Sequence, residues 1–330
     1  MPLDMQLFGI TMSIWKLWLS MVGTLALIIG LSTLVFTVIL SLAGVFDLLT
    51  LGILVVTINI VQWLIAPYMV DAIYKVRALP ENENPQLHQA VSDLSQKSGI
   101  KKPKLMLSQI PLPNAFAYGS PLTGSRVAVT QGLLKDLDEG EVEAVIGHEL
   151  GHLKHRDVQI MMAVSFLPAL FTYIGYSLML SSMYQGNRRS EGGGSALIGI
   201  AFMAFAWVLN MFTLYLSRLR EYFADRHSAG VVDSGAQKLS MGLAKIVNTT
   251  KSPRKPQQQK QNLAFKSLFI SDPERVTTDA AAINAMQTSS KSDLVQEILS
   301  QKLTTEAKIK EAFSTHPNII KRLRALQELS

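Results

Sequence analysis

Two histidines stand four residues apart in the segment His148-Glu149-Leu150-Gly151-His152. On a helix this spacing places both imidazoles on one face, about 6 Å apart, which is close enough for both to bind one zinc ion. Glu149 points to a neighbouring angle, from which its carboxylate can reach a water molecule on the metal without being a ligand. Zinc lowers the pKa of such a water towards about 7, and the carboxylate can accept its proton as hydroxide attacks a carbonyl. The segment therefore predicts peptide hydrolysis. Since a shuffled chain would contain His-Glu-x-x-His only roughly 0.004 times, a pair of surface histidines beside a solvated acid is the weaker interpretation.

A zinc hydrolase needs a third protein ligand and an open coordination position for water. Glu221 and Asp225 fit this need, because they lie four residues apart just after a long apolar segment and would share one face of its helical extension. We expect Glu221 to coordinate zinc and Asp225 to accept the free ring N–H of a ligand histidine. The alternative is an exposed acid pair bridged to Arg218 and Arg226.

These motifs resemble the HtpX family of membrane-bound heat-shock zinc metallopeptidases, relatives of the CAAX prenyl endopeptidase among the gluzincins. The resemblance covers nearly the whole chain and rests on Gly147–His152, on Glu221 with Asp225, on Asn114–Gly119 and on Thr315-His316-Pro317. It implies an endopeptidase that cleaves misfolded or damaged membrane proteins in membrane protein quality control. By the resemblance, His148, His152 and Glu221 are the zinc ligands, Glu149 is the catalytic base and Asp225 supports His148.

The segment Asn114-Ala115-Phe116 receives a role from the same resemblance. In relatives it lies at the edge of the sheet beside the cleft and pairs with extended substrate. Main-chain hydrogen bonds at a sheet edge suit peptides, because they do not depend on side-chain identity. Asn114 could instead serve as a turn residue after Pro113.

His316 and Arg322 are candidates for substrate binding or for stabilising the transition state. In the family pattern the His-Pro pair is usually followed by a second proline, whereas Asn318 follows here, and Arg322 stands where a family arginine is commonly found. His316 could donate a hydrogen bond to the developing oxyanion. It could equally have a structural role, because His-Pro is a common start of a helix.

A helix must carry the zinc motif, and the sequence predicts one. Asp138 as N-cap and Glu141 three residues later form a capping pair. The apolar stripe that follows consists of Val142, Val145, Ile146, Leu150 and Leu153. Residues 84–98 are also expected to be helical, short strands are expected at 104–110, 114–118 and 126–130, and the polar stretch 251–262 is expected to be a loop. The motif would therefore lie in an α+β, zincin-like domain with a small β-sheet.

Four windows without a charged residue surround these elements: 17–46, 48–70, 158–187 and 192–217, of 30, 23, 30 and 26 residues. Each exceeds the roughly 20 apolar residues that a helix needs to cross a bilayer, so we expect four transmembrane helices in two hairpins. Buried core helices are the alternative. Because the second hairpin returns the chain to the same face, the two segments that carry the metal ligands can meet there.

The distribution of positive charge predicts the orientation of these spans. Only two basic residues, Arg188 and Arg189, lie near span ends on one face, against eight on the face with the zinc motif: Lys16, Lys75, Arg77, Lys154, Arg156, Arg218, Arg220 and Arg226. By the positive-inside rule, the face that carries the zinc motif and the eight basic residues is cytoplasmic. We therefore expect a multi-pass protein of the cell (cytoplasmic) membrane whose catalytic domain faces the cytoplasm.

The composition excludes several other classes of protein. Hydrophobic residues make up 48% of the 330 residues and charged residues only 17%, too few to coat soluble domains of this size. The net charge of +6 comes from scattered residues without an RNP, zinc-finger or basic-zipper pattern, so no nucleic-acid partner is expected. With no cysteine, the chain cannot form disulfides or thiolate metal sites, and a metal must be held by His, Asp or Glu.

Together these patterns predict a mainly α membrane protein. Residues 1–70 and 158–217 would form the two transmembrane hairpins, and residues 71–157 and 218–330 the two parts of the catalytic domain. The expected function is that of a zinc metalloendopeptidase with one Zn²⁺ per chain, placed in the lipid bilayer and acting on unfolded or membrane polypeptides. The alternative is a non-catalytic scaffold or transporter that uses the metal structurally, although such spans usually carry ionisable groups and these have none.

Overall fold

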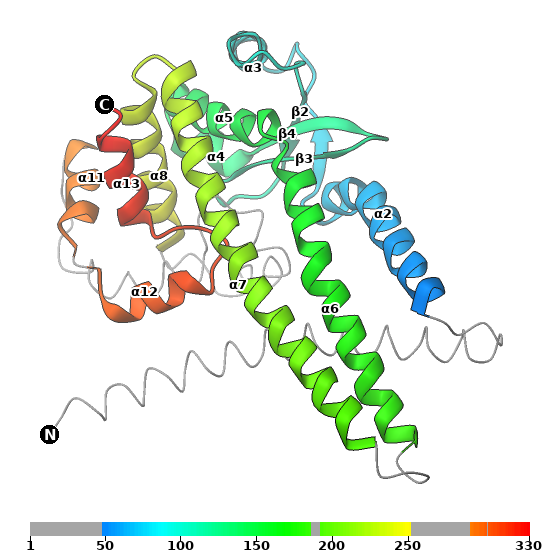
Figure 1. The fold of residues 1–330 in the computed structure, drawn as a ribbon. Coiled ribbons are helices and arrows are strands. Elements are labelled where there is room, and N and C mark those ends of the chain that lie inside the picture. The colour runs from blue at the N-terminus through cyan, green and yellow to red at the C-terminus, as the bar shows by residue number, and fades with distance from the viewer. Residues whose placement is uncertain (1–47, 186–191, 252–290, 302) are drawn as a thin grey trace, which may run out of the picture. The chain divides into compact units, whose positions relative to one another are not determined.

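The computed structural model describes residues 48–185, 192–251, 291–301 and 303–330, which are mostly helical with one small sheet (Figure 1). They divide into two compact units. The helical unit contains residues 48–61, 159–185, 192–216 and 305–313, and the sheet unit contains the other described residues. The helices are α2 (Leu48–Ile73), α3 (Pro85–Ser98), α4 (Gln131–Asp136), α5 (Glu139–Lys154), α6 (Asp157–Gln185), α7 (Gly192–Val231), α8 (Gly235–Lys251), α11 (Lys291–Ser300), α12 (Thr305–Ala312) and α13 (Ile319–Gln327).

The sheet has four strands in the order β1-β2-β4-β3: β1 (Val76–Ala78), β2 (Lys104–Ser108), β3 (Ala115–Ser120) and β4 (Gly124–Thr130). β2 and β4 are parallel, and the other two pairs are antiparallel. β3 is therefore an edge strand of this sheet. The three predicted strands are confirmed. The sequence does not predict β1, because three residues are too few to show the alternation of a strand.

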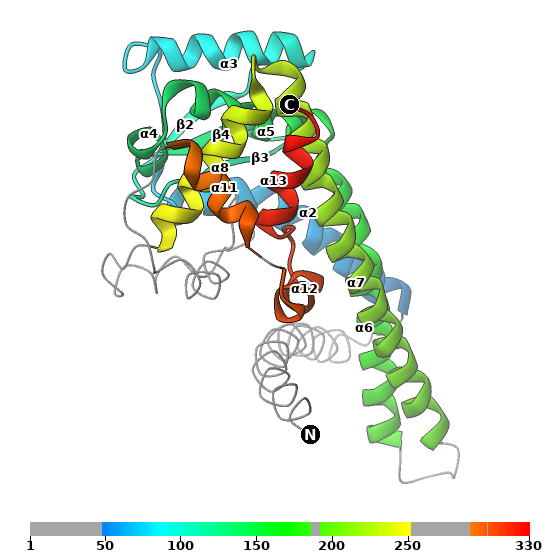
Figure 2. The ribbon, with the colours of Figure 1, turned by 90° about the vertical axis from the view of Figure 1, so that its left-hand side faces the viewer.

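Alternate residues of the strands enter two different apolar clusters, as the two-residue period of a strand requires. One set packs in the main core with α5 and α8: Leu105, Leu107, Ala115, Val127 and Val129. The other set packs with Val70 of α2 and with Tyr74, the residue after that helix: Met106, Phe116, Tyr118 and Ala128. α8, α11 and α13 lie side by side and contribute to the main core (Figures 1 and 2). Because α5 and the end of α2 pack on opposite faces, β3 is held from both sides.

α5 begins with the predicted capping box, in which Asp138 and Glu141 satisfy each other's backbone N–H groups. Two glycines of this helix allow α7 to pack closely against it. A Cβ atom at Gly151 would lie 3.0 Å from Ala224 Cα of α7, and one at Gly147 would lie 3.0 Å from Cγ2 of Val232, the residue directly after α7. The helix that carries the zinc motif is thus fixed at short range to the extension of α7.

α6 and α7 cover the third and fourth predicted spans. Asp157–Leu180 and Ala196–Val231 are each long and apolar enough to cross a membrane, judged by length and composition. The apolar stretch Ile60–Ile73 of α2 is shorter than a span. The predicted span 17–46 lies outside the described residues, as does the predicted loop 251–262 apart from Lys251. Two spans are therefore supported, and the four-span topology stays a prediction.

Candidate metal centre

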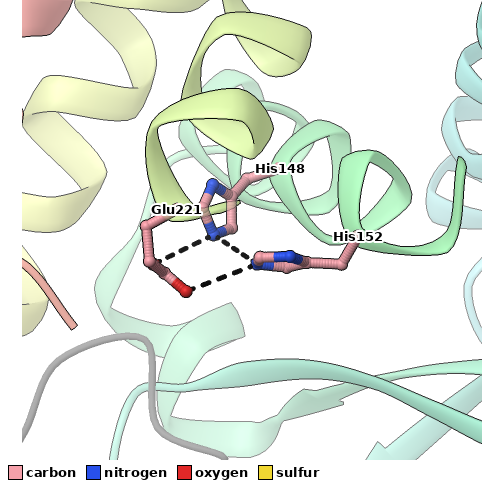
Figure 3. A group of neighbouring side chains, drawn as sticks. All are labelled: His148, His152 and Glu221. Atoms are coloured by element: carbon pink, nitrogen blue, oxygen red, sulfur yellow. Dashed lines mark hydrogen bonds and ion pairs between the residues drawn. The ribbon is translucent and has the colours of Figure 1, made fainter. Parts of the chain in front are cut away.

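Three side chains from two helices bring their metal-binding atoms within 4.8 Å of one another: His148 and His152 of α5 and Glu221 of α7 (Figure 3). The two Nε2 atoms are 3.1 Å apart. Oε2 of Glu221 lies 3.7 Å from His148 Nε2, and its other oxygen, Oε1, lies 3.6 Å from His152 Nε2. Ligand atoms bound to a tetrahedral zinc ion at about 2.05 Å are separated by roughly 3.4 Å. The observed distances bracket this value, so the donor set fits a single zinc ion.

Each histidine has a carboxylate at its other ring nitrogen. Asp225 Oδ1 lies 2.9 Å from His148 Nδ1, and Asp157 Oδ2 lies 2.6 Å from His152 Nδ1. A carboxylate favours the proton on Nδ1, which leaves the lone pair of Nε2 available for a metal. The contact of Asp225 is the one expected from its spacing to Glu221. The contact of Asp157 is not predicted from the sequence, because this acid follows the motif helix after a turn and its direction depends on that turn.

Arg322 of α13 joins the two acids of α7. Its Nε and Nη2 donate to Asp225 at 2.9 Å and 2.6 Å, and its Nη1 lies 3.0 Å from Glu221 Oε2. His316 Nδ1 lies 3.2 Å from the other Glu221 oxygen. Burial opposes the negative charge of Glu221, but His316 and Arg322 outweigh this effect and hold the pKa of Glu221 well below its ordinary value. Glu221 is therefore a carboxylate at neutral pH, which is the form that binds a metal.

Glu149 lies beside the three candidate ligands and is only 3% exposed. Its Oε2 accepts a hydrogen bond from the backbone N–H of Ala117 at 2.8 Å. Burial raises the pKa of Glu149, although His152 and His148 oppose the shift. A carboxylate with a raised pKa accepts a proton more readily, so the position and the environment of Glu149 both suit a general base.

The segment Asn114-Ala115-Phe116 lies at the start of edge strand β3. Asn114 pairs with Thr130, because its backbone N–H donates to Thr130 Oγ1 at 2.9 Å and its carbonyl accepts from Thr130 N–H at 3.0 Å. Phe116 points to the second cluster, where its ring lies 5.2 Å from that of Tyr74. The residue of β3 that reaches Glu149 is Ala117, one position beyond the predicted three. Side chains alternate between the two faces of a strand, so Ala117 lies on the same face as Ala115, towards the main core with α5. This alternation is the signal that could have pointed to Ala117.

Comparisons with known proteins identify the family of the chain. Residues 81–330 match peptidase family M48. The chain is 36% identical to a protease HtpX homolog of Thermoplasma acidophilum over 296 residues, which cover 88% of each chain. It is 35% identical to a protease HtpX homolog of Aeropyrum pernix over 317 residues, or 94% of this chain and 96% of that one.

A solved structure shares the fold. The structure of S. mikatae Ste24p matches with a TM-score of 0.52 at 19% identity and covers 94% of this chain, which spans 66% of the length of that one. The resemblance predicted from the motifs is thereby confirmed. The chain belongs to peptidase family M48, with the HtpX proteases as its relatives, and is a metalloprotease.

Proposed function

We propose that this metalloprotease is a zinc-dependent endopeptidase of the cell membrane, that its catalytic unit faces the cytoplasm, and that it cleaves misfolded or damaged membrane proteins. The observation that carries the proposal is the position of Glu149, buried and within the same site as the three candidate ligands His148, His152 and Glu221. Two imidazole nitrogens and one carboxylate are a donor set typical of catalytic zinc. When bound, zinc would supply a Lewis acid that polarises the scissile carbonyl and lowers the pKa of the attacking water.

Glu149 would act as the general base. Its carboxylate accepts the proton of the attacking water and then returns it to the nitrogen of the departing amine, so that the peptide C–N bond breaks with no net change at Glu149. The hydrogen bond from Ala117 fixes one carboxylate oxygen and leaves the other for the proton. The same bond ties the base to β3, the strand on which we expect substrate to lie.

Substrate would bind as an additional strand at the edge formed by β3. Asn114 exchanges hydrogen bonds with Thr130 of β4, so in an antiparallel pair the next residue, Ala115, and then Ala117 turn their backbone groups outward. The N–H of Ala117 already donates to Glu149, so its carbonyl and both backbone groups of Ala115 would bind substrate. Such groups bind an extended backbone whatever its side chains, which favours unfolded polypeptides over folded ones.

Arg322 and His316 receive different roles. Arg322 is 1% exposed and bonds to Asp225, so we propose that it holds the acids of α7 in place and does not contact substrate. His316 lies beside Glu221. It remains a candidate for donating a hydrogen bond to the developing oxyanion.

The alternative function is a scaffold or transporter in which the metal is purely structural. Structural zinc sites usually have four protein ligands and no open position. Among the described residues the metal-binding group has three members, and a buried carboxylate stands next to it. The arrangement therefore favours catalysis.

The proposal is tested with the full chain purified in detergent and with casein as an unfolded substrate. Removal of the metal by a chelator should abolish cleavage, stoichiometric Zn²⁺ should restore it, and Mg²⁺ should not. A folded globular protein of similar size should be cleaved much more slowly than casein. Undiminished casein cleavage by protein shown by elemental analysis to be free of metal would refute the zinc-dependent mechanism.

A further inference from the structure

Asp157 contacts the candidate metal centre from outside its group of ligands. One carboxylate oxygen, Oδ2, lies 2.6 Å from His152 Nδ1. The other, Oδ1, is in close contact with Nη2 of Arg220, which also donates to the carbonyl of His155 at 3.0 Å. The side chains of Asp157 and Arg220 are only 10% and 12% exposed. Both oxygens of a nearly buried carboxylate are therefore used, one by a metal ligand and one by a cation.

The two histidines of the motif differ in how firmly packing holds them. The His148 side chain is 1% exposed, whereas that of His152 is 19% exposed. Fewer neighbouring atoms thus restrain the His152 ring. The hydrogen bond to Asp157 has a larger share in setting its rotation and its tautomer, and these decide whether Nε2 faces the metal.

The backbone just before Asp157 has an unfavourable conformation, which suggests that the contact between Asp157 and His152 has a function. Arg156, the residue before Asp157, has a positive φ of 53°. This left-handed conformation is unfavourable for a residue with a Cβ atom, and such residues persist where the surroundings require them. Here the turn at residues 155–156 connects α5 to α6, and the side chain of the first residue of α6 reaches His152.

We propose that Asp157 is a positioning residue for His152 and that Arg220 holds Asp157 in place. The metal centre would then contain two carboxylate–histidine pairs, Asp225 with His148 and Asp157 with His152. The second pair links the site to the first residue of α6 and, through Arg220, to the residue next to Glu221 on α7. This inference rests on the proposed metal site.

The test compares zinc binding by the full chain and its variants in detergent, measured by competition with a chelator. Asp157→Asn keeps the size of the side chain but removes its charge, so zinc affinity should fall roughly 10- to 100-fold, as is typical for partners of metal-bound histidines. The visible spectrum of the Co²⁺-substituted protein should change as well, because the His152 ring is no longer oriented. Asp233→Asn is the matched control, since that side chain is 97% exposed, and it should leave both readouts unchanged.

The folded state of each variant is checked on metal-free protein by circular dichroism and thermal unfolding. If Asp157→Asn does not fold, Arg220→Gln takes its place and should weaken zinc binding to a smaller extent, because Asp157 then loses only its support. Wild-type zinc affinity together with an unchanged Co²⁺ spectrum in a folded variant would overturn the inference. If the wild type bound no zinc, the proposed function itself would fail, so the two failures are distinguishable.

Discussion

Glu149 illustrates how a single residue at this site depends on its surroundings. Its carboxylate is buried, it accepts one hydrogen bond from Ala117, and its pKa is raised by burial. The helical spacing of the motif predicts that Glu149 lies beside the metal without being a ligand. The N–H group that orients it comes from a strand about 30 residues earlier, and no sequence pattern pairs the two. The contact of Asp157 with His152 is hidden for a similar reason, because it depends on the turn at Arg156.

The role of Glu149 gives the first prediction. Glu149→Gln keeps the volume of the side chain and an acceptor for Ala117 N–H but cannot accept a proton. Cleavage of casein should fall about 10²- to 10⁴-fold while the zinc content stays at the wild-type value. Glu143→Gln, on the same helix, is the control and should keep wild-type activity. Activity retained by the metal-loaded Glu149→Gln variant would contradict the assignment of the base.

At the scale of elements, the site depends on the close packing of α5 against α7. The capping box of α5 and the apolar stripe of its helix are readable from sequence, and the helix begins where they predict. The short strand β1 and helix α4 are not predicted, because three and six residues carry too little periodicity. The two glycines of the motif are visible in the sequence, but their use as contact points for Ala224 and Val232 requires the fold.

The packing of these helices gives the second prediction. Gly151→Ala places a Cβ atom 3.0 Å from the backbone of Ala224, so overpacking should cost about 1–3 kcal/mol, more than the gain in helix propensity of up to ~1 kcal/mol. The thermal midpoint should fall by a few degrees and zinc affinity should decrease, since α7 carries Glu221. Gly230→Ala is the matched control, because nothing lies within 4 Å of its Cβ position, and its midpoint should stay the same or rise. Equal midpoints for the two variants would show that close packing at Gly151 is unimportant.

At the scale of the whole molecule, the zinc motif and the third candidate ligand are separated in sequence by the segment 158–217 and meet in one unit. The even number of predicted crossings in that segment makes the meeting foreseeable from sequence. The existence of α6 and α7 as apolar helices is foreseeable too, because long uncharged windows are a strong signal. The orientation of the spans is inferred only from the distribution of Lys and Arg near their ends, and it remains a prediction.

The absence of cysteine from the chain allows a direct test of this orientation, because a single introduced cysteine is a unique probe. Ser190→Cys lies between the third and fourth predicted spans, and Asp233→Cys replaces a side chain that is 97% exposed in the sheet unit. In intact cells a membrane-impermeant maleimide should label the first variant and not the second, whereas both should be labelled after permeabilisation. The cysteine-free parent is the control. The reverse pattern in intact cells would place the catalytic unit outside.

The most direct test of the metal centre is the zinc content of the purified chain with and without Glu221. If His148 and His152 of one segment and Glu221 of another bind the same ion, the wild type should hold about one zinc ion. Glu221→Ala should lose it on dialysis against a weak chelator, and Glu149→Gln should retain it. Zinc bound by Glu221→Ala with the stoichiometry and affinity of the wild type would contradict the shared site.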